Sequence, residues 1–290
     1  MTRPLTISLG PPPAAPPVRR GSFARALTVA ASLIAACGGG GSGPAARPAP
    51  PAPAAPSGPA QRGELATAEA VLEASIAAQG GRERMSRIKA MRQTGTFLIP
   101  QMGMKGSMTS LTAAPRNSLL AIELTGVGKI RLGVSGDIAW EMNPLTGARV
   151  LAGPELVQQL RESTFNGDLV WKELYPKAEL AGTAEFAGQP AYKIVLTAPD
   201  GDTQTRFIAK DTLLPLGVQM VAKSQMGDVP AEAELSDWRE VGGIKYPHRL
   251  QRKEGPQAIE IAIDKIELDP PLDPATFALP PEIAALTKQP

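Results

Sequence analysis

The chain of 290 residues carries 30 lysines and arginines against 28 aspartates and glutamates, with one cysteine and one histidine. Positions 1–62 hold six arginines and no acid, which leaves 24 basic and 28 acidic residues, a net charge of −4, for the rest. This mildly acidic part argues against nucleic acid as a partner. One cysteine excludes a disulfide within the chain, and one histidine excludes a zinc site built from histidine and cysteine.

The first segment has the organisation of an export signal. Three arginines at 19–25 precede an apolar run, 26–36, that ends directly before Cys37. The run is too short for a bilayer, which takes about 20 residues, and its order of basic and apolar parts is typical of a signal peptide. Ile34-Ala35-Ala36-Cys37 resembles the lipobox of bacterial lipoproteins. The resemblance implies a signal peptide at 1–36 and a diacylglyceryl group, usually with an amide-linked chain such as palmitate, on Cys37. Ordinary cleaved export is the alternative.

The residues after Cys37 predict a tether to the membrane. Gly38 follows the cysteine, and by resemblance to Gram-negative lipoproteins a residue other than Asp permits transport to the outer membrane. Residues 37–62 are rich in Gly and Ser, then in Pro and Ala, and such a segment cannot bury enough apolar surface to fold. Fully extended, it reaches on the order of 75 Å. We therefore expect a lipid-anchored protein of the cell envelope, at the outer membrane facing the periplasm.

Residues 63–290 have a length that suits one domain, and two helices are predicted in it. The first has apolar residues at helical spacing and ends at Gly80-Gly81; these residues are Leu65, Ala68, Leu72 and Ile76. The second begins at Pro154, which fits the first helical position. Its expected apolar side consists of Leu156, Val157 and Leu160.

The rest of the domain alternates apolar and polar residues with a period of two. This pattern predicts strands near 130–134, 138–142, 192–196, 216–222, 244–250 and 259–263. Turn signals such as Ser135-Gly136-Asp137 and Gly242-Gly243 separate them. The apolar phase changes between Ile263 and Ile266, which predicts a bulge near Asp264-Lys265.

These elements predict a mainly β (α+β) fold. Short strands with tight turns form an antiparallel meander with one buried face and one wet face. A sheet of about ten strands tends to curl, and only two helices are at hand to cover it. We expect a curved antiparallel half-barrel whose concave face is covered by the N-terminal helix and the second helix.

Several segments of the chain resemble a known superfamily. They are Gly80-Gly81, Thr94-Gly95-Thr96-Phe97, Gly136-Asp137-Ile138-Ala139-Trp140, Pro154-Glu155-Leu156, Val241-Gly242-Gly243-Ile244-Lys245-Tyr246-Pro247 and Asp273-Pro274-Ala275-Thr276-Phe277-Ala278-Leu279-Pro280. This pattern, over most of residues 64–280, resembles the LolA/LolB-like superfamily of periplasmic and outer-membrane lipoproteins. The resemblance implies a concave half-barrel with a helical lid that shields acyl chains. It carries over no specific ligand-contacting residue.

A search for catalytic or metal-binding groups finds little. His248 falls on the apolar side of a predicted strand, where a lone histidine is usually a hydrogen-bonded core residue. Ser135 belongs to Gly133-Val134-Ser135-Gly136, which is a hairpin turn rather than a nucleophile elbow. Asp200-Gly201-Asp202 lacks the calcium-loop pattern and favours a turn. We therefore expect no enzyme, no metal and no cofactor; a hydrolase dependent on Ser135 or an acid is the least favoured alternative.

The remaining hypothesis is an apolar cavity inside the half-barrel. Methionine adapts to irregular apolar shapes, so the three methionines of 102–108 are expected at its rim, although core filling in a strand pair is the alternative. The predicted cavity residues are Leu72, Ile76, Met102, Met104, Met108, Trp140, Leu156 and Leu160. The sequence favours a non-catalytic carrier or receptor that binds an acyl chain or a lipoprotein. The alternative is a structural or interaction lipoprotein of the envelope without a small-molecule ligand, which predicts an exposed apolar patch.

Overall fold

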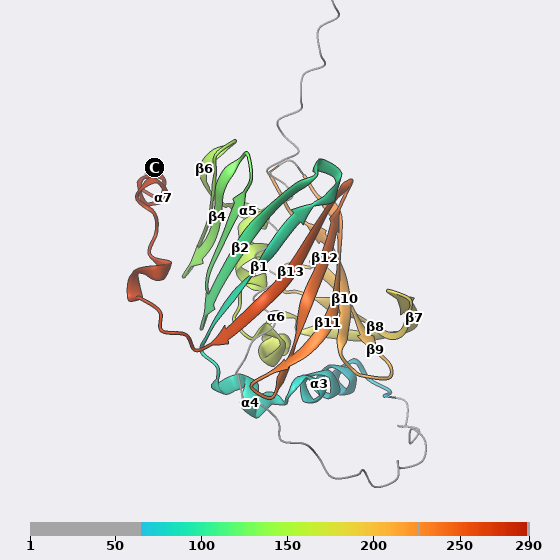
Figure 1. Cartoon of the computed structure of the whole chain (residues 1–290). Coiled ribbons are helices and arrows are strands. Elements are labelled where there is room, and N and C mark those ends of the chain that lie inside the picture. Colours follow the sequence, from blue (N-terminus) through green and yellow to red (C-terminus); the bar gives the residue numbers. More distant parts are fainter. Residues whose placement is uncertain (1–64, 226, 289–290) are drawn as a thin grey trace, which may run out of the picture.

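The computed structural model describes residues 65–225 and 227–288 (Figure 1). The predicted signal peptide, Cys37 and the tether lie outside these residues, so processing and lipidation stay predictions. The described part is mainly β, with one antiparallel sheet that curves without closing and a few helices. No helix of this part is long and apolar enough to cross a membrane.

The sheet has thirteen strands in the order β6-β5-β4-β3-β2-β1-β13-β12-β11-β10-β9-β8-β7. One meander runs from the centre to one edge: β1 Ala90–Ile99, β2 Met104–Ala113, β3 Asn117–Leu124, β4 Gly128–Ser135, β5 Ile138–Asn143 and β6 Gly147–Val150. The other runs from the opposite edge back to the centre: β7 Lys177–Phe186, β8 Gln189–Thr197, β9 Thr203–Ala209, β10 Pro215–Ala222, β11 Val229–Val241, β12 Ile244–Glu254 and β13 Gln257–Leu268. The first and last strands pair in the middle, and the edges β6 and β7 are successive strands in the chain.

The predicted number of about ten strands is wrong, because the structure has thirteen. The edge strands explain part of the difference. β7 is buried only at Phe186, and β6 has four residues, none of them buried. A strand that lies at an edge and is wetted on both faces carries no apolar alternation in its sequence, so period-two patterning does not find it.

The predicted bulge near Asp264-Lys265 is confirmed at the centre of the sheet. Thr94 of β1 opposes Lys265 of β13, while the next residue, Gly95, opposes Ile263, so Asp264 is the extra residue. A Cβ atom at Gly95 would lie 2.0 Å from the carbonyl oxygen of Ala262. Glycine therefore allows the close approach of the two backbones where the pairing register changes.

Both predicted helices are present. The helical segments are α3 Ala68–Gln79, α4 Arg82–Arg87, η1 Pro100–Met102, α5 Gly153–Glu162, η2 Gly167–Val170, α6 Trp171–Leu174, η3 Pro274–Phe277 and α7 Pro281–Leu286. Thr67 caps α3 by accepting a hydrogen bond from the amide of Ala70 at 3.1 Å. The helix ends at Gly80, which has a φ of 140° that favours glycine. A Cβ atom added at Gly80 would also lie only 2.7 Å from the carbonyl oxygen of Gly243, so a larger residue does not fit.

The helices lie where they can cover the concave face. α5, η2 and α6 form the connection between the two edge strands, and Figure 1 shows α5 and α6 within the curve of the sheet, α3 and α4 across one end, and α7 outside. Val71, Leu72 and Ile76 of α3 belong to the main core together with apolar residues of most strands. α3 contacts β7 and β12, so it spans the end of the C-terminal meander.

Candidate functional site

An apolar cleft lies beneath α3, between that helix and three strands of the C-terminal meander. Its space is about 640 Å³, part of it open to solvent. The apolar lining comes from α3, α6, β9, β10 and β11: Leu72, Ile76, Trp171, Ile208, Val218 and Leu235. The polar lining consists of Ser75, Gln79, Asp168, Gln204 and Arg206. The cleft thus combines a mostly apolar wall with a few convergent polar groups, which is the usual composition of a ligand site.

A hydrogen-bonded network fixes α3 over the cleft. Trp171 donates its indole N–H to Oε1 of Glu73 at 3.2 Å, and Arg82 donates to the same oxygen at 2.8 Å. Burial raises the pKa of the Glu73 carboxyl, but the hydrogen bonds from Arg82 and Trp171, with the nearby positive charges, outweigh it and lower the pKa. Glu73 therefore stays ionised near neutral pH and joins α3 to α6, which holds the tryptophan in the cleft wall.

The polar end of the cleft contains a paired arginine and an aromatic ring. Arg206 of β9 donates to the carboxylate of Asp168 at 2.6 Å, and both side chains are mostly buried. The guanidinium carbons of Arg161 and Arg206 each lie 5.8 Å from the ring centre of Tyr175. Burial raises the pKa of the Tyr175 hydroxyl, although both arginines act in the opposite direction. Tyr175 is therefore a neutral group held among charges that are already partnered.

Two further hollows continue the cleft toward α5. One has about 420 Å³ of space, part of it open to solvent, and shares Asp168, Gln204 and Arg206 with the cleft. The other, about 200 Å³, shares Gln204 with both. Gln204 lies where the three hollows meet, is only 9% exposed, and its Oε1 has no hydrogen-bond partner.

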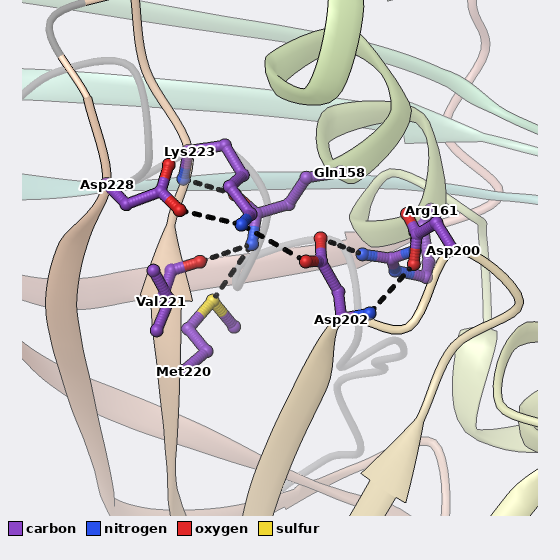
Figure 2. Close-up of polar contacts among 8 residues, drawn as sticks. All are labelled: Gln158, Arg161, Asp200, Asp202, Met220, Val221, Lys223 and Asp228. Atoms are coloured by element: carbon purple, nitrogen blue, oxygen red, sulfur yellow. Dashed lines mark hydrogen bonds and ion pairs between the residues drawn. The ribbon is translucent and has the colours of Figure 1, made fainter.

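Polar contacts hold α5 against the C-terminal meander (Figure 2). The Gln158 amide bonds the backbone of β10 and the residue after it: Nε2 donates to the carbonyl of Val221 at 2.9 Å, and Oε1 accepts from the amide of Lys223 at 2.7 Å. Arg161 donates to Asp200 at 2.8 Å and to Asp202 at 3.1 Å. We call these residues, with Lys223 and its partner Asp228 at 2.8 Å, the α5 clasp.

The start of α5 is held to the other edge of the sheet. Arg149 of β6 pairs with Glu141 at 2.9 Å and with Glu155 at 2.8 Å. Burial lowers the pKa of the Arg149 guanidinium, but its bonds and charge interactions with the two glutamates outweigh this and raise the pKa. α5 therefore connects both meanders across the open side of the sheet through its two ends.

The structure places two of the eight predicted cavity residues in the cleft, Leu72 and Ile76. Met108 is buried in the main core, and Met104 packs against it. Leu156 and Leu160 pack instead on a separate small cluster of Val134, Ala139 and Leu151.

Met102 and Trp140 do not line the cleft either. Met102 is 48% exposed. Leu132 and Val134 of β4 face inward, so Gly133 between them faces outward. A Cβ atom at Gly133 would meet the Trp140 ring, and the ring therefore covers the outer face of β4. Acyl-chain binding by the eight residues as a set stays a prediction.

The inward side of α5 differs from the prediction. Val157 is 47% exposed, whereas Glu155 and Gln158 are buried. Sequence reasoning also missed Gln204 and Arg206, which share one face of β9 with the apolar Ile208. That shared alternation is the only sequence signal that could have placed them at an interior wall.

The residues considered for chemistry occupy structural positions. His248 is buried on β12, and its Nδ1 lies 3.1 Å from the carbonyl oxygen of Tyr246, which confirms a hydrogen-bonded core histidine. Ser135 ends β4 and pairs with Ile138 in a hairpin, and four strands lie between β4 and β12 in the sheet. Within residues 65–225 and 227–288, no group of three or more His, Cys, Asp or Glu side chains could hold a metal ion.

No protein-family model matches the chain, and no curated protein matches its sequence. Solved structures do. One is a DUF1329 family protein from Desulfovibrio piger, 14% identical, covering 72% of this chain and 96% of that chain with a TM-score of 0.51. Another is a LolA superfamily protein from Nitrosomonas europaea, 15% identical, covering 74% and 99% with a TM-score of 0.50. At this identity the likeness shows the fold, and it confirms the LolA/LolB-like architecture that the sequence resembles.

Proposed function

We propose that this protein is a non-catalytic lipoprotein of the bacterial cell envelope that binds a lipid or the acyl chain of a lipoprotein. One observation carries the proposal: the cleft beneath α3, whose wall is mainly apolar and lies on the concave side of a LolA-like sheet. Each methylene group that such a wall takes from water contributes about 0.8 kcal/mol. A chain of several methylenes thereby gains enough to offset the freedom that it loses on binding.

The sequence supports a membrane location for this activity. The lipobox-like segment before Cys37 and the Pro/Ala tether up to residue 62 favour a domain held near a bilayer by its own lipid. A tethered domain meets membrane lipids at high local concentration, so even a modest affinity of the cleft suffices for exchange. Anchoring at Cys37 and location at the outer membrane are part of the proposal.

The test is lipid binding by the full-length chain with Cys37→Ala, which removes the predicted lipidation site. Native mass spectrometry should detect co-purified lipid, and a fluorescent single-chain lipid should bind. Val218→Phe should weaken that binding about tenfold or more, because Val218 lines the cleft and is 4% exposed.

Val221→Phe is the matched control, because Val221 lies on the same strand and is 42% exposed. Its affinity for the probe should equal that of the parent chain. Lipid-free preparations that also fail to bind the probe would contradict the proposal. The large exposed apolar side chains of the described residues come from η1, the β5–β6 turn, α5 and β10: Met102, Leu145, Val157 and Val221.

A further inference from the structure

Four hairpin turns at one end of the sheet carry no charged residue. They connect β5 to β6, β3 to β4, β1 to β2 and β12 to β13, and they consist of residues 144–146, 125–127, 100–103 and 255–256. In the sheet order these eight strands follow one another from the β6 edge to β12. Figure 1 shows this end of the sheet on the side away from α3 and α4. We call the four turns the uncharged rim.

Contacts join the four turns along the end of the sheet. A Cβ atom at Gly128, directly after the β3–β4 turn, would lie 3.6 Å from Cγ of Pro144 in the β5–β6 turn. The amide of Thr125 in the β3–β4 turn donates to the carbonyl of Lys105, beside the β1–β2 turn, at 3.4 Å. η1, which forms most of the β1–β2 turn, contacts β13, the strand that follows the fourth turn. The rim is therefore one edge rather than four scattered loops.

The rim exposes apolar side chains. Leu145 is 54% exposed and Met102 is 48% exposed, and they are the two most exposed large apolar side chains of the described residues. Three prolines are exposed beside them: Pro100, Pro144 and Pro256. The turns at the other end of the N-terminal meander are charged, with Arg116 after β2 and Asp137 after β4. An exposed apolar edge that is confined to one end indicates a surface that meets an apolar medium.

Lysines lie directly behind the rim. Within two residues of the four turns, the exposed charged side chains are Lys105, Lys129, Lys253 and Glu123. Three positive charges against one negative charge leave a net charge of +2. A lysine in this position extends its ammonium group to lipid phosphates while the neighbouring apolar residue enters the interface. The charge behind the rim therefore complements an anionic lipid surface.

The predicted anchor allows this end of the sheet to reach a bilayer. The described chain begins at Leu65, next to α3, at the end of the sheet opposite the rim. The longest strand, β11, has 13 residues and spans about 43 Å. The predicted tether reaches on the order of 75 Å. A chain anchored at Cys37 is therefore long enough to place the rim on the membrane that holds it.

We propose that the uncharged rim docks the domain on an anionic membrane surface. Met102 and Leu145 enter the interfacial layer, and the three lysines behind the rim meet the lipid phosphates. The lysines and the predicted anchor at Cys37 favour a bilayer over a protein partner, because both match a lipid surface. The inference goes beyond the lipid-binding cleft, which lies beneath α3 and is built from other residues.

The first test asks which end of the protein meets the membrane. Cys37→Ala removes the only cysteine and with it the predicted anchor, so Leu145→Cys in that full-length chain takes one environment-sensitive dye. With vesicles of phosphatidylethanolamine and phosphatidylglycerol, the emission of the dye should shift to the blue, because the dye leaves water. Asp137→Cys is the matched control: it lies in a turn at the other end of the same meander, is 92% exposed, and its dye should not shift.

The second test measures the affinity of the unlabelled Cys37→Ala chain for the same vesicles by flotation. Leu145→Ser should weaken binding about fivefold, and adding Met102→Ser should weaken it further, because less apolar surface leaves water. Val157→Ser is the matched control, since Val157 is 47% exposed but lies on α5 outside the rim. It should change the affinity by less than about twofold. Vesicles of phosphatidylcholine, which carry no net charge, should bind about tenfold more weakly.

The outcomes decide between the rim and its alternatives. A blue shift at both labels, no shift at either label, or equal effects of Leu145→Ser and Val157→Ser would overturn the assignment of the rim. Equal binding to phosphatidylcholine would overturn the assignment of an anionic surface. The fluorescent single-chain lipid reports the cleft in the same variants, and Leu145→Ser should leave its binding unchanged. Failure of the rim to bind vesicles therefore leaves the lipid-binding function standing, and an empty cleft leaves the rim standing.

Discussion

Arg252 is a buried cation on the inner side of β12, and it is 1% exposed. Its Nε lies 3.5 Å from Oε2 of Glu254, and its Nη2 has no hydrogen-bond partner. Burial lowers the pKa of its guanidinium, against the opposing charges of Glu162 and Glu254. The interior of this half-barrel therefore holds charge as well as apolar side chains, and each charge depends on its partners.

Arg252→Met should lower the free energy of unfolding by about 3 kcal/mol, because it leaves buried carboxylates without their cation. Urea unfolding followed by tryptophan fluorescence measures this change. Adding Glu254→Gln should regain part of the loss. Arg249→Met, on the same strand with a side chain 65% exposed, is the control and should change stability by less than about 0.5 kcal/mol. Equal effects of Arg252→Met and Arg249→Met would show that the buried charge is not coupled to Glu254.

At the scale of elements, the Gln158 side chain joins α5 to β10 and makes backbone bonds that a neighbouring strand would otherwise make. Gln158→Leu removes both bonds of the clasp to the backbone, to the carbonyl of Val221 and to the amide of Lys223. The free energy of unfolding should fall by about 1–3 kcal/mol, because both backbone groups lose a hydrogen-bond partner. The amide of Lys223 should also exchange its hydrogen faster. Gln159→Leu, which removes a bond to Ser163 at the C-terminal cap of α5, should leave that exchange rate unchanged.

The α5 clasp should also weaken in acid. Burial raises the pKa of the Asp200 carboxyl, but the hydrogen bond from Arg161 and the backbone bond of Asp202 outweigh this and lower the pKa. A carboxyl whose pKa is lower in the folded chain stabilises it above the unfolded pKa, about 3.9, and this contribution disappears as the pH falls through the folded pKa.

Asp200→Asn should therefore be about 0.5–1 kcal/mol less stable than the parent at pH 7, a magnitude typical of partly exposed pairs. The difference should shrink below about pH 4 and vanish near pH 2. Urea unfolding at several pH values measures it. Asp137→Asn is the control: it removes the ion pair with Arg116, in which the Asp137 side chain is 92% exposed, and it should change the free energy of unfolding little at any pH. A difference for Asp200→Asn that persists in acid would exclude the ion pair as its cause.

The limits of sequence reasoning appear most clearly in α5 and β9. The strand of Ile244, Tyr246 and Leu250 and the bulge at Asp264 follow from apolar phase, because a core face repeats every second residue. Leu72 and Ile76 were found in the same way, with a helical period. The same patterns do not predict the inward positions of Gln158 and Gln204, because polar residues in an amphipathic pattern are assigned to solvent. In this fold they face inward, since the inner wall at the site is partly polar.

At the scale of the whole molecule, the topology makes β13 the strand that joins two halves. β1 is the first strand of the N-terminal meander and β13 is the last strand of the C-terminal meander. Both lie at the centre of the sheet, and their pairing links the two meanders. This pairing joins residues far apart in the chain, such as Met91 with Leu268, and the sheet can be completed only when the chain is almost complete. The residues after β13 pack outside the sheet, where α7 contacts β6 and Ile283 is fully buried.

Two truncations test this organisation. A chain ending at Asp269 keeps the bonds of this residue to Lys89 and Ala90 and loses η3 and α7. It should still unfold cooperatively, about 2 kcal/mol less stable because the burial of Ile283 is lost. A chain ending at Glu254 lacks β13, which leaves β1 and β12 as unpaired edges with exposed core faces, and it should show no cooperative transition. Circular dichroism and tryptophan fluorescence in urea distinguish the two results. Cooperative unfolding of the shorter chain would mean that the α5 clasp and the helices can hold the two meanders together without the central pair.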